Sequence, residues 1–185
     1  MQDAANGNRS TSWVKVVLVG RDFRFTLVRI VVLAAVVWFV SSYVLMPIRV
    51  QGPSMLPTYS ENGVNFVNRL SYRQVDPQCG DVIAIRFSGK HAMLMKRVVG
   101  LPGETVQFHR GRLLINGTVL PEPYLDSKAM CDWDLPAETL APDEFYVVGD
   151  NRSMPYQNHT FGKAKRYRIM GKILLCKNLF TSWGR

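Results

Sequence analysis

Two short stretches of the chain hold residues that could do chemistry. Residues 51–58 place the hydroxyl of Ser54 in a Gly-Pro turn, and residues 93–99 place the amine of Lys96 among apolar side chains. A serine hydroxyl is a weak nucleophile at neutral pH, so it needs a base within hydrogen-bond reach. Burial can turn a lysine into that base, because desolvation favours the neutral amine and lowers its pKa. Together the two stretches predict a hydrolase with a serine nucleophile and a lysine base.

Neither stretch is specific by itself. A serine beside glycine and proline is usually part of an ordinary turn, and a single lysine in a strand is usually solvated. The charged neighbour of Lys96, Arg97, would point to the opposite face of a strand. Two further stretches in a fixed order make the pattern more specific. Gly80-Asp81-Val82 lies between the first two stretches, and Gly149-Asp150-Asn151-Arg152 follows them.

Residues 52–58, 80–82, 96–104 and 149–152 resemble the motifs of type I signal peptidases in residue type and in order. This serine/lysine family includes the pilin-processing peptidases of conjugation systems, and the resemblance extends over roughly residues 48–175. It implies Ser54 as the nucleophile and Lys96 as the general base. It also implies that the backbone N–H of Ser54 donates to the oxyanion of the tetrahedral intermediate.

The resemblance assigns supporting roles to four more residues. Gly52 occupies the position at which some family members carry an oxyanion-binding hydroxyl, so a second donor is left to the backbone or to water. Met55 is expected to pack beside the nucleophile. Asp150 and Arg152 are expected to support the site from behind, as structure and not as chemistry.

The chain departs from the family after residue 152. The family usually has a serine three residues on, which hydrogen-bonds the catalytic lysine, and then an Asp-Ser-Arg triplet. Pro155 and Gln157-Asn158-His159 stand at these positions here. The change removes one donor to Lys96, for which Ser153, Asn158 or water is the candidate substitute.

An uncharged run from Ile30 to Met46 is nearly long enough to cross a membrane. As a helix it spans about 26 Å, and residues 25–28, with Arg29 reaching toward the headgroups, bring it to bilayer thickness. Lys and Arg outnumber Asp and Glu before the run, which predicts a cytoplasmic N-terminus. We expect a cytoplasmic basic segment (1–24), a transmembrane helix (25–46) and an extracytoplasmic catalytic domain (47–185), in the bacterial inner membrane. A cleavable secretory signal is the alternative, but its apolar core would be shorter.

The formal net charge of +9 could indicate binding to nucleic acid, but the distribution of charge opposes it. Both flanks of the chain are basic, whereas residues 50–150 are mildly acidic. We expect membrane lipid as a partner and no nucleic acid. The C-terminal basic residues either aid solubility or touch anionic headgroups; they are Lys163, Lys165, Arg166, Arg168, Lys172 and Lys177.

The region after Pro47 reads as mainly β. Short runs rich in β-branched and aromatic residues alternate with turn residues, and Asn116-Gly117 is a strong hairpin signal. The pattern predicts strands at residues 64–67, 82–87, 93–99, 105–108, 113–115 and 145–148. An antiparallel, barrel-like domain follows, and the resemblance implies the same fold. The acidic, proline-punctuated stretch 121–142 is expected to be a surface loop.

No metal or other cofactor is expected. CxxC and HxxxH spacings are absent, and His91, His109 and His159 are dispersed. A Ser-His-Asp triad is the alternative catalytic arrangement, but none of the histidines falls in the shared motifs. The cysteines leave at least one thiol unpaired and their spacing chooses no disulfide; they are Cys79, Cys131 and Cys176.

The resemblance implies a membrane-bound endopeptidase that cleaves signal peptides from secreted precursors. The precursor would bind as an added extended strand, with small residues such as alanine at the first and third positions before the cut. Two alternatives stay open. One is a conjugation-associated peptidase that matures or cyclises a pilin. The other is a degenerate, non-catalytic module that binds signal peptides, which the departures at Pro155 and residues 157–159 suggest.

Overall fold

The structure, a computed structural model, describes residues 23–88, 92–125, 131–159 and 162–174 of the 185-residue chain. The chain divides into two units, Met1–Ser42 and Tyr43–Arg185. The first unit contains the helix α2 (Phe23–Phe39), and a π-helical turn, η1 (Val40–Val44), follows it.

The helix is apolar on every side, which is typical of a membrane span. The helical segment Arg24–Val44 has 21 residues and a mean hydropathy of 2.2, and its apolar window is 0% buried. At 1.5 Å per residue it is about 32 Å long, enough to cross the hydrocarbon core of a bilayer. An N-terminal apolar helix is therefore present, as the sequence predicts. It ends at Val44, so the last two residues of the expected span, Leu45 and Met46, belong to the first strand.

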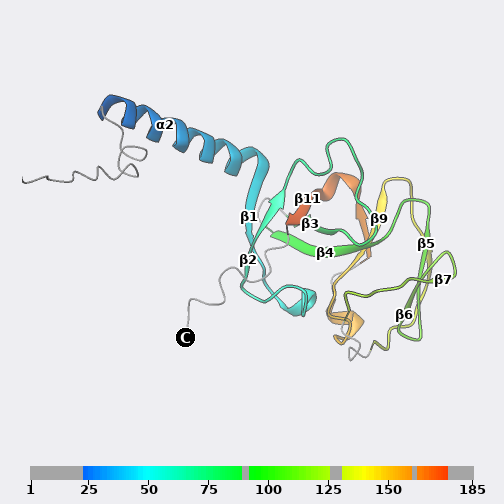
Figure 1. Ribbon diagram of the computed structural model, residues 1–185. Helices are drawn as coiled ribbons and strands as arrows, with labels where there is room; N and C mark the ends of the chain where they lie inside the picture. The colour runs from blue at the N-terminus through cyan, green and yellow to red at the C-terminus, as the bar shows by residue number, and fades with distance from the viewer. Residues whose placement is uncertain (1–22, 89–91, 126–130, 160–161, 175–185) are drawn as a thin grey trace, which may run out of the picture. The chain divides into compact units, whose positions relative to one another are not determined.

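The second unit contains two antiparallel sheets (Figure 1). The larger has seven strands in the order β1-β2-β11-β3-β4-β9-β10, and every neighbouring pair is antiparallel. Its strands are β1 (Leu45–Arg49), β2 (Val64–Asn68), β3 (Val82–Ser88), β4 (Ala92–Gly100), β9 (Glu144–Val148), β10 (Gly162–Lys165) and β11 (Ile169–Leu174).

The smaller sheet has four strands in the order β7-β6-β5-β8. They are β5 (Thr105–His109), β6 (Arg112–Ile115), β7 (Thr118–Val119) and β8 (Leu135–Thr139). Asn116 and Gly117 join β6 to β7 with φ angles of 51° and 79°, the left-handed conformation that a type I′ turn requires. The predicted hairpin turn is confirmed.

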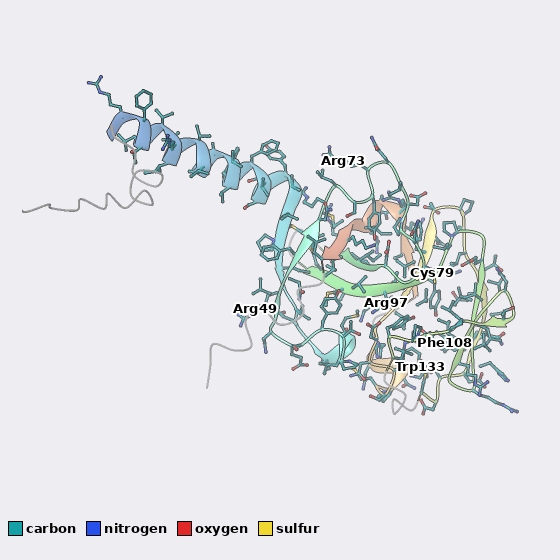
Figure 2. All side chains as sticks on the ribbon, viewed as in Figure 1. Arg49, Arg73, Cys79, Arg97, Phe108 and Trp133 are labelled. Atoms are coloured by element: carbon teal, nitrogen blue, oxygen red, sulfur yellow. The ribbon has the colours of Figure 1, made fainter. Side chains whose placement is uncertain are left out.

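Three clusters of buried side chains fill the second unit. The first includes Met55 and Met95 and lies beside the turn that follows β1. The second packs β3 against β9. The third joins the smaller sheet to β4 and β9 and contains Phe108 and Trp133, whose ring centroids are 5.1 Å apart (Figure 2). The third cluster therefore fixes the smaller sheet against the strand that carries Lys96.

The expectation of a surface loop is wrong for part of the stretch 121–142. Leu135–Thr139 form β8, and Trp133 is 1% exposed. Pro136 fits because β8 is the last strand of its sheet, where a missing N–H breaks no ladder, and the pairing with β5 is irregular there. Proline and acidic residues are depleted in strands, so the sequence pattern did not predict β8.

The fold class agrees with the sequence, although β1, β7, β10 and β11 were not among the predicted strands. The architecture is mainly antiparallel β with one N-terminal apolar helix among the described residues, as predicted. Each strand that the pattern predicts is present, with its ends within one residue of expectation. The two sheets place β4 between β3 and β9, in the interior of the larger sheet.

Candidate active site

Ser54 lies on a tight turn after β1. Pro53–Met55 form a short 3₁₀ helix, η2, closed by a hydrogen bond from the Leu56 N–H to the Pro53 carbonyl at 3.1 Å. Gly52 precedes the turn with a φ of 86°, which glycine adopts without strain. The first N–H groups of a helical turn have no acceptor inside it. The N–H of Ser54 is therefore left for another acceptor, as an oxyanion donor must be.

Lys96 reaches Ser54 from β4. Its Nζ donates a hydrogen bond to Ser54 Oγ at 2.8 Å, and the residue is only 2% exposed. Burial lowers the pKa of Lys96 to about 8, and the negative charge of Asp150 opposes that change. About a tenth of the amine is then neutral at pH 7, whereas a solvated lysine is almost fully charged. The pair has the geometry of a hydroxyl nucleophile with its general base.

The segment Gly149–Asn151, which we name the strap, runs along the back of the Ser54 turn. The Asn151 N–H donates to the Ser54 carbonyl at 3.0 Å, and Asn151 Nδ2 donates to the Pro53 carbonyl at 3.1 Å. A Cβ on Gly149 would lie 2.2 Å from the Ser54 carbonyl oxygen. Only glycine allows the strap to come this close to the nucleophile turn.

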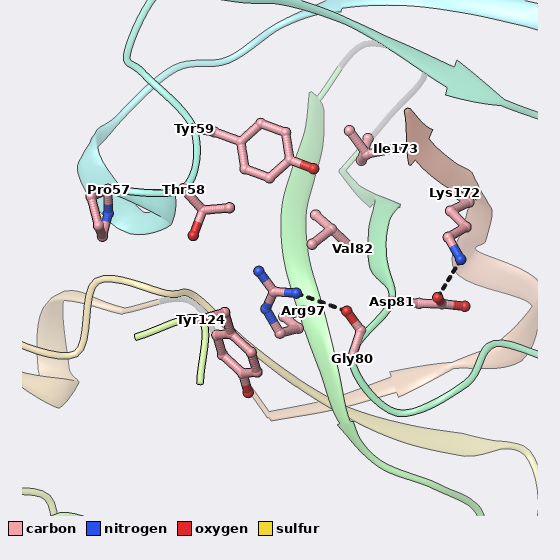
Figure 3. Close-up of a pocket in the computed structure, with 10 residues that line it drawn as sticks. All are labelled: Pro57, Thr58, Tyr59, Gly80, Asp81, Val82, Arg97, Tyr124, Lys172 and Ile173. Atoms are coloured by element: carbon pink, nitrogen blue, oxygen red, sulfur yellow. Dashed lines mark hydrogen bonds and ion pairs between the residues drawn. The ribbon is translucent and has the colours of Figure 1, made fainter. Parts of the chain in front are cut away.

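Asp150 is buried beside Arg97, the neighbour of Lys96. Arg97 Nε and Nη2 donate to the two carboxylate oxygens at 2.8 and 2.5 Å. Arg97 Nη1 donates to the Gly80 carbonyl at 2.8 Å (Figure 3). Arg97 Cζ lies 3.9 Å from the centroid of the Tyr124 ring, and both residues border a cavity of about 670 Å³. The positive charge of Arg97 offsets the negative charge of the Asp150 carboxylate. The carboxylate therefore raises the pKa of Lys96 less than an unpaired carboxylate would.

Arg152 holds the strap from its other end. It is 1% exposed; its Nε donates to the Gly149 carbonyl at 2.9 Å, and its Nη groups pair with Glu122. Its guanidinium carbon lies 5.4 Å from the ring centroid of Phe108. The strap is thus attached to the smaller sheet as well as to the nucleophile turn.

A narrow groove opens beside Ser54 between the end of β1 and the first half of β4. Its cavity is about 60 Å³ and is lined by Ile48, Arg49, Val50, Gln51, Ser54, Met55, Met93, Leu94 and Met95. Among the residues that the structure describes, β9 pairs with β4 only from Arg97 onward, and β1 pairs with β2 alone. Both walls of the groove are therefore open strand edges, which can accept an additional strand.

The site contains titratable side chains and no evident metal cage. Among the described residues, no group of three or more His, Cys, Asp or Glu side chains is placed to hold a metal ion. Cys79 and Cys131 are free thiols, and Cys176 lies outside the described residues.

Sequence comparison decides the family. The model of the family described as signal peptidase, peptidase S26, matches residues 24–177. The chain belongs to this family. Signal peptidase I of Leptolyngbya laminosa is 38% identical over 130 residues, which cover 66% of this chain and 63% of that protein. Signal peptidase I V of Bacillus subtilis is 32% identical over 146 residues, which cover 72% of this chain and 86% of that protein.

Another relative and a solved structure also match. The probable signal peptidase I-2 of Synechocystis is 30% identical over 128 residues, which cover 58% of it. The chain thus spans less than two thirds of the length of the two cyanobacterial relatives. A signal peptidase I structure from Enterococcus faecalis is 27% identical and covers 54% of this chain, with a TM-score of 0.44.

The structure shows what stands at the positions where the chain departs from the family. Pro155 is exposed and begins the 3₁₀ helix η3 (Tyr156–Asn158), whose residues are also exposed. Ser153 Oγ donates to Asn151 Oδ1 at 2.6 Å instead of reaching Lys96. The hydrogen bond that orients the Lys96 amine in the described residues is the one to Ser54.

The sequence prediction missed several residues that build the site. Glu122 and Tyr124 lie in the stretch that the sequence predicts to be a loop, and for Arg97 the sequence predicts only the direction of the side chain. His159 lies outside the shared motifs, yet it is buried and its Nε2 lies 2.7 Å from the Asn151 carbonyl. The one available signal was that His159 ends the triplet in which the chain departs from the family.

Proposed function

We propose that this protein is a membrane-bound signal peptidase that cleaves signal peptides from secreted precursors with a Ser54/Lys96 dyad. The observation that carries the proposal is the 2.8 Å hydrogen bond between the buried Lys96 amine and Ser54 Oγ. Membership of the signal peptidase family and the apolar helix at Arg24–Val44 support it.

The dyad can carry both halves of a serine acyl transfer. The neutral Lys96 amine takes the Ser54 proton as the oxygen attacks the scissile carbonyl, and the resulting ammonium gives a proton to the leaving amine. The Ser54 N–H stabilises the oxyanion, a contribution of roughly 3–4 kcal/mol per donor in other hydrolases. A water that loses its proton to Lys96 then hydrolyses the acyl-enzyme.

The groove between β1 and β4 suits an extended peptide. The N–H and C=O of Val98 face β3, because Val98 exchanges hydrogen bonds with Gly80 and Asp81. Since these directions alternate along a strand, the N–H and C=O of Met93 and Met95 face the open edge. A precursor in the groove can therefore pair with β4, which supplies main-chain affinity, while its alternate side chains enter the cavity.

The cavity favours small side chains. Its volume of about 60 Å³ and its lining of Met55, Met93 and Met95 leave room for an alanine but not for a large apolar residue. This supports cleavage after small residues at the first and third positions before the cut. The helix would hold the groove near the outer membrane face, with the N-terminus in the cytoplasm and residues 47–185 outside.

The test is cleavage of a precursor with an Ala-x-Ala site by the full-length protein in detergent. Wild type should cut at that site, and Ser54→Ala and Lys96→Ala should each reduce kcat by at least a thousandfold while the far-UV spectrum stays unchanged. A wild type that binds the precursor but leaves it uncut would refute the proposal in favour of a binding module. Selective cutting or cyclisation of a pilin precursor would favour the conjugative alternative.

A further inference from the structure

His159 lies against the strap, close to the Ser54 turn. Its ring is 8% exposed and makes an edge contact with Trp133, with centroids 4.9 Å apart and planes at 70°. A Cβ on Gly149 would lie 3.0 Å from His159 Cε1 and 2.2 Å from the Ser54 carbonyl oxygen. The imidazole and the Ser54 carbonyl therefore both pack against Gly149, where a side chain would collide with each of them.

A chain of hydrogen bonds connects His159 with the nucleophile. His159 Nε2 lies 2.7 Å from the Asn151 carbonyl oxygen. A carbonyl oxygen only accepts, so Nε2 carries the proton and donates. Asn151 in turn donates its N–H to the Ser54 carbonyl and its Nδ2 to the Pro53 carbonyl. Two steps thus lead from the imidazole to the backbone of the nucleophile.

The pKa of His159 is lowered from its ordinary value, so the imidazole is neutral near pH 8, where Lys96 titrates. Burial is the main cause that lowers the pKa of His159; the hydrogen bond to Asn151 opposes it, and the positive charges of Lys96 and Arg152 add to it. A charged imidazole here would face two cations. The charge of His159 therefore does not change while Lys96 titrates, and any effect of the residue has to be geometric.

We propose that His159 is a positioning residue that holds the Ser54 turn in register with Lys96 through the Asn151 carbonyl of the strap. This inference rests on the proposed function. It assigns a purpose to the residue at which the chain departs from the family triplet, and it requires both the Nε2–H donor and the ring packed on Trp133. A nucleophile displaced by about 1 Å can lose about a hundredfold in rate.

Three full-length variants test the proposal. His159→Phe keeps an aromatic ring against Trp133 and removes the donor, while His159→Gln keeps an N–H at the place of Nε2. His109→Phe is the matched control, because His109 is exposed and pairs only loosely with Asp134 at 3.3 Å. Precursor cleavage gives kcat and KM across pH, and a small serine-reactive fluorophosphonate counts competent Ser54 hydroxyls.

We expect His159→Phe to label to full stoichiometry but at least tenfold more slowly than wild type. Its kcat per competent site should fall at least tenfold with KM within twofold and with an unchanged acid midpoint. His159→Gln should recover part of the rate, and His109→Phe should match wild type. Amide hydrogen exchange should rise at residues 149–152 in His159→Phe alone.

Other outcomes overturn the inference. An unchanged rate per competent site, or a loss confined to labelling stoichiometry, would make His159 a folding residue only. A shifted acid midpoint would mean that it acts on Lys96 and not on the turn. If wild type neither labels nor cleaves while Ser54→Ala behaves identically, the proposed function fails first and this inference with it.

Discussion

The central residue is Lys96, and its chemistry depends on two opposing effects. Burial disfavours the ammonium and lowers the pKa to about 8, whereas Asp150 favours it. Arg97 holds the Asp150 carboxylate in a bidentate pair, which weakens its influence on the amine. In the proposed dyad, the pKa of Lys96 therefore depends on Arg97, the next residue on the same strand.

This arrangement predicts the pH profile of cleavage. The neutral amine is the active form, so kcat/KM should rise about tenfold per pH unit below about 8 and level off above it. Asp150→Asn removes the charge that favours the ammonium, so the midpoint should move to lower pH. The exposed substitution Asp143→Asn should leave it in place. A midpoint that stays fixed or rises in Asp150→Asn would contradict this electrostatic account.

Burial of the Lys96 ammonium is expected to lower the free energy of unfolding at neutral pH. Because the folded pKa of Lys96 is below the unfolded value, the unfolded chain binds more protons between about pH 8 and 10.5, and stability rises across that window. Lys96→Met removes the buried ammonium and should raise the free energy of unfolding at pH 7 by ~2 kcal/mol. The gain should shrink as pH approaches 10.

Denaturant melts at pH 7 and pH 10 measure this difference. The exposed substitution Lys165→Met is the control and should change neither melt by more than about 0.5 kcal/mol. A Lys96→Met variant that is less stable than wild type at pH 7 would show that the hydrogen bond to Ser54 outweighs the burial of the charge.

At the scale of elements, β4 has two different edges. Its second half is paired on both sides, while residues 92–96 are paired with β3 only within the described part of the chain. The open half carries the groove wall, and the paired half anchors Arg97 and the third buried cluster. One strand thus combines a rigid base with an edge that is free to bind a peptide.

A pair of proline substitutions on β4 tests this division. Met93→Pro removes an N–H that faces the open edge, so KM for the precursor should rise at least fivefold with little change in stability. Leu94→Pro removes an N–H that faces β3 and should destabilise the domain by about 3 kcal/mol or more. Thermal melts and precursor kinetics of the two variants give the comparison. Equal stability losses would mean that Met93 is already bonded inside the domain.

Prediction from sequence succeeded where the information is local. The strands and the Asn116-Gly117 turn follow from side-chain alternation and turn chemistry over a few residues. β8 was missed because an edge strand tolerates a proline that the pattern penalises. The pairing of Lys96 with Ser54 was expected from the chemistry of the two residue types and from the family resemblance, which fixed the order of the motifs. The partners Glu122 and His159 were not found, because their contacts join segments that no short motif connects.

At the scale of the whole molecule, the apolar helix and the proposed dyad belong to different units of the chain. The apolar helix supplies the means to stay at a membrane, and the β unit contains the dyad, the groove and the strap within residues 43–185. If the basic N-terminal segment lies in the cytoplasm, the β unit has to be on the other side, where secreted precursors emerge.

Thiol labelling can determine this orientation. Cys79 is exposed, so a Cys131→Ser/Cys176→Ser variant leaves one reporter on the β unit. We expect a membrane-impermeant maleimide to label Cys79 in intact spheroplasts. Partial burial, followed by the nearby charge of Glu104, raises the pKa of this thiol, so the reaction should be run near pH 8 and followed over time. A second variant adds Cys79→Ser and Ser10→Cys to the same Cys131→Ser/Cys176→Ser background. Its single thiol reports on the N-terminal segment and should react only after the membrane is permeabilised. The reverse pattern would place the groove in the cytoplasm, where cleavage of exported precursors cannot occur, and would remove the physical basis for the anchor.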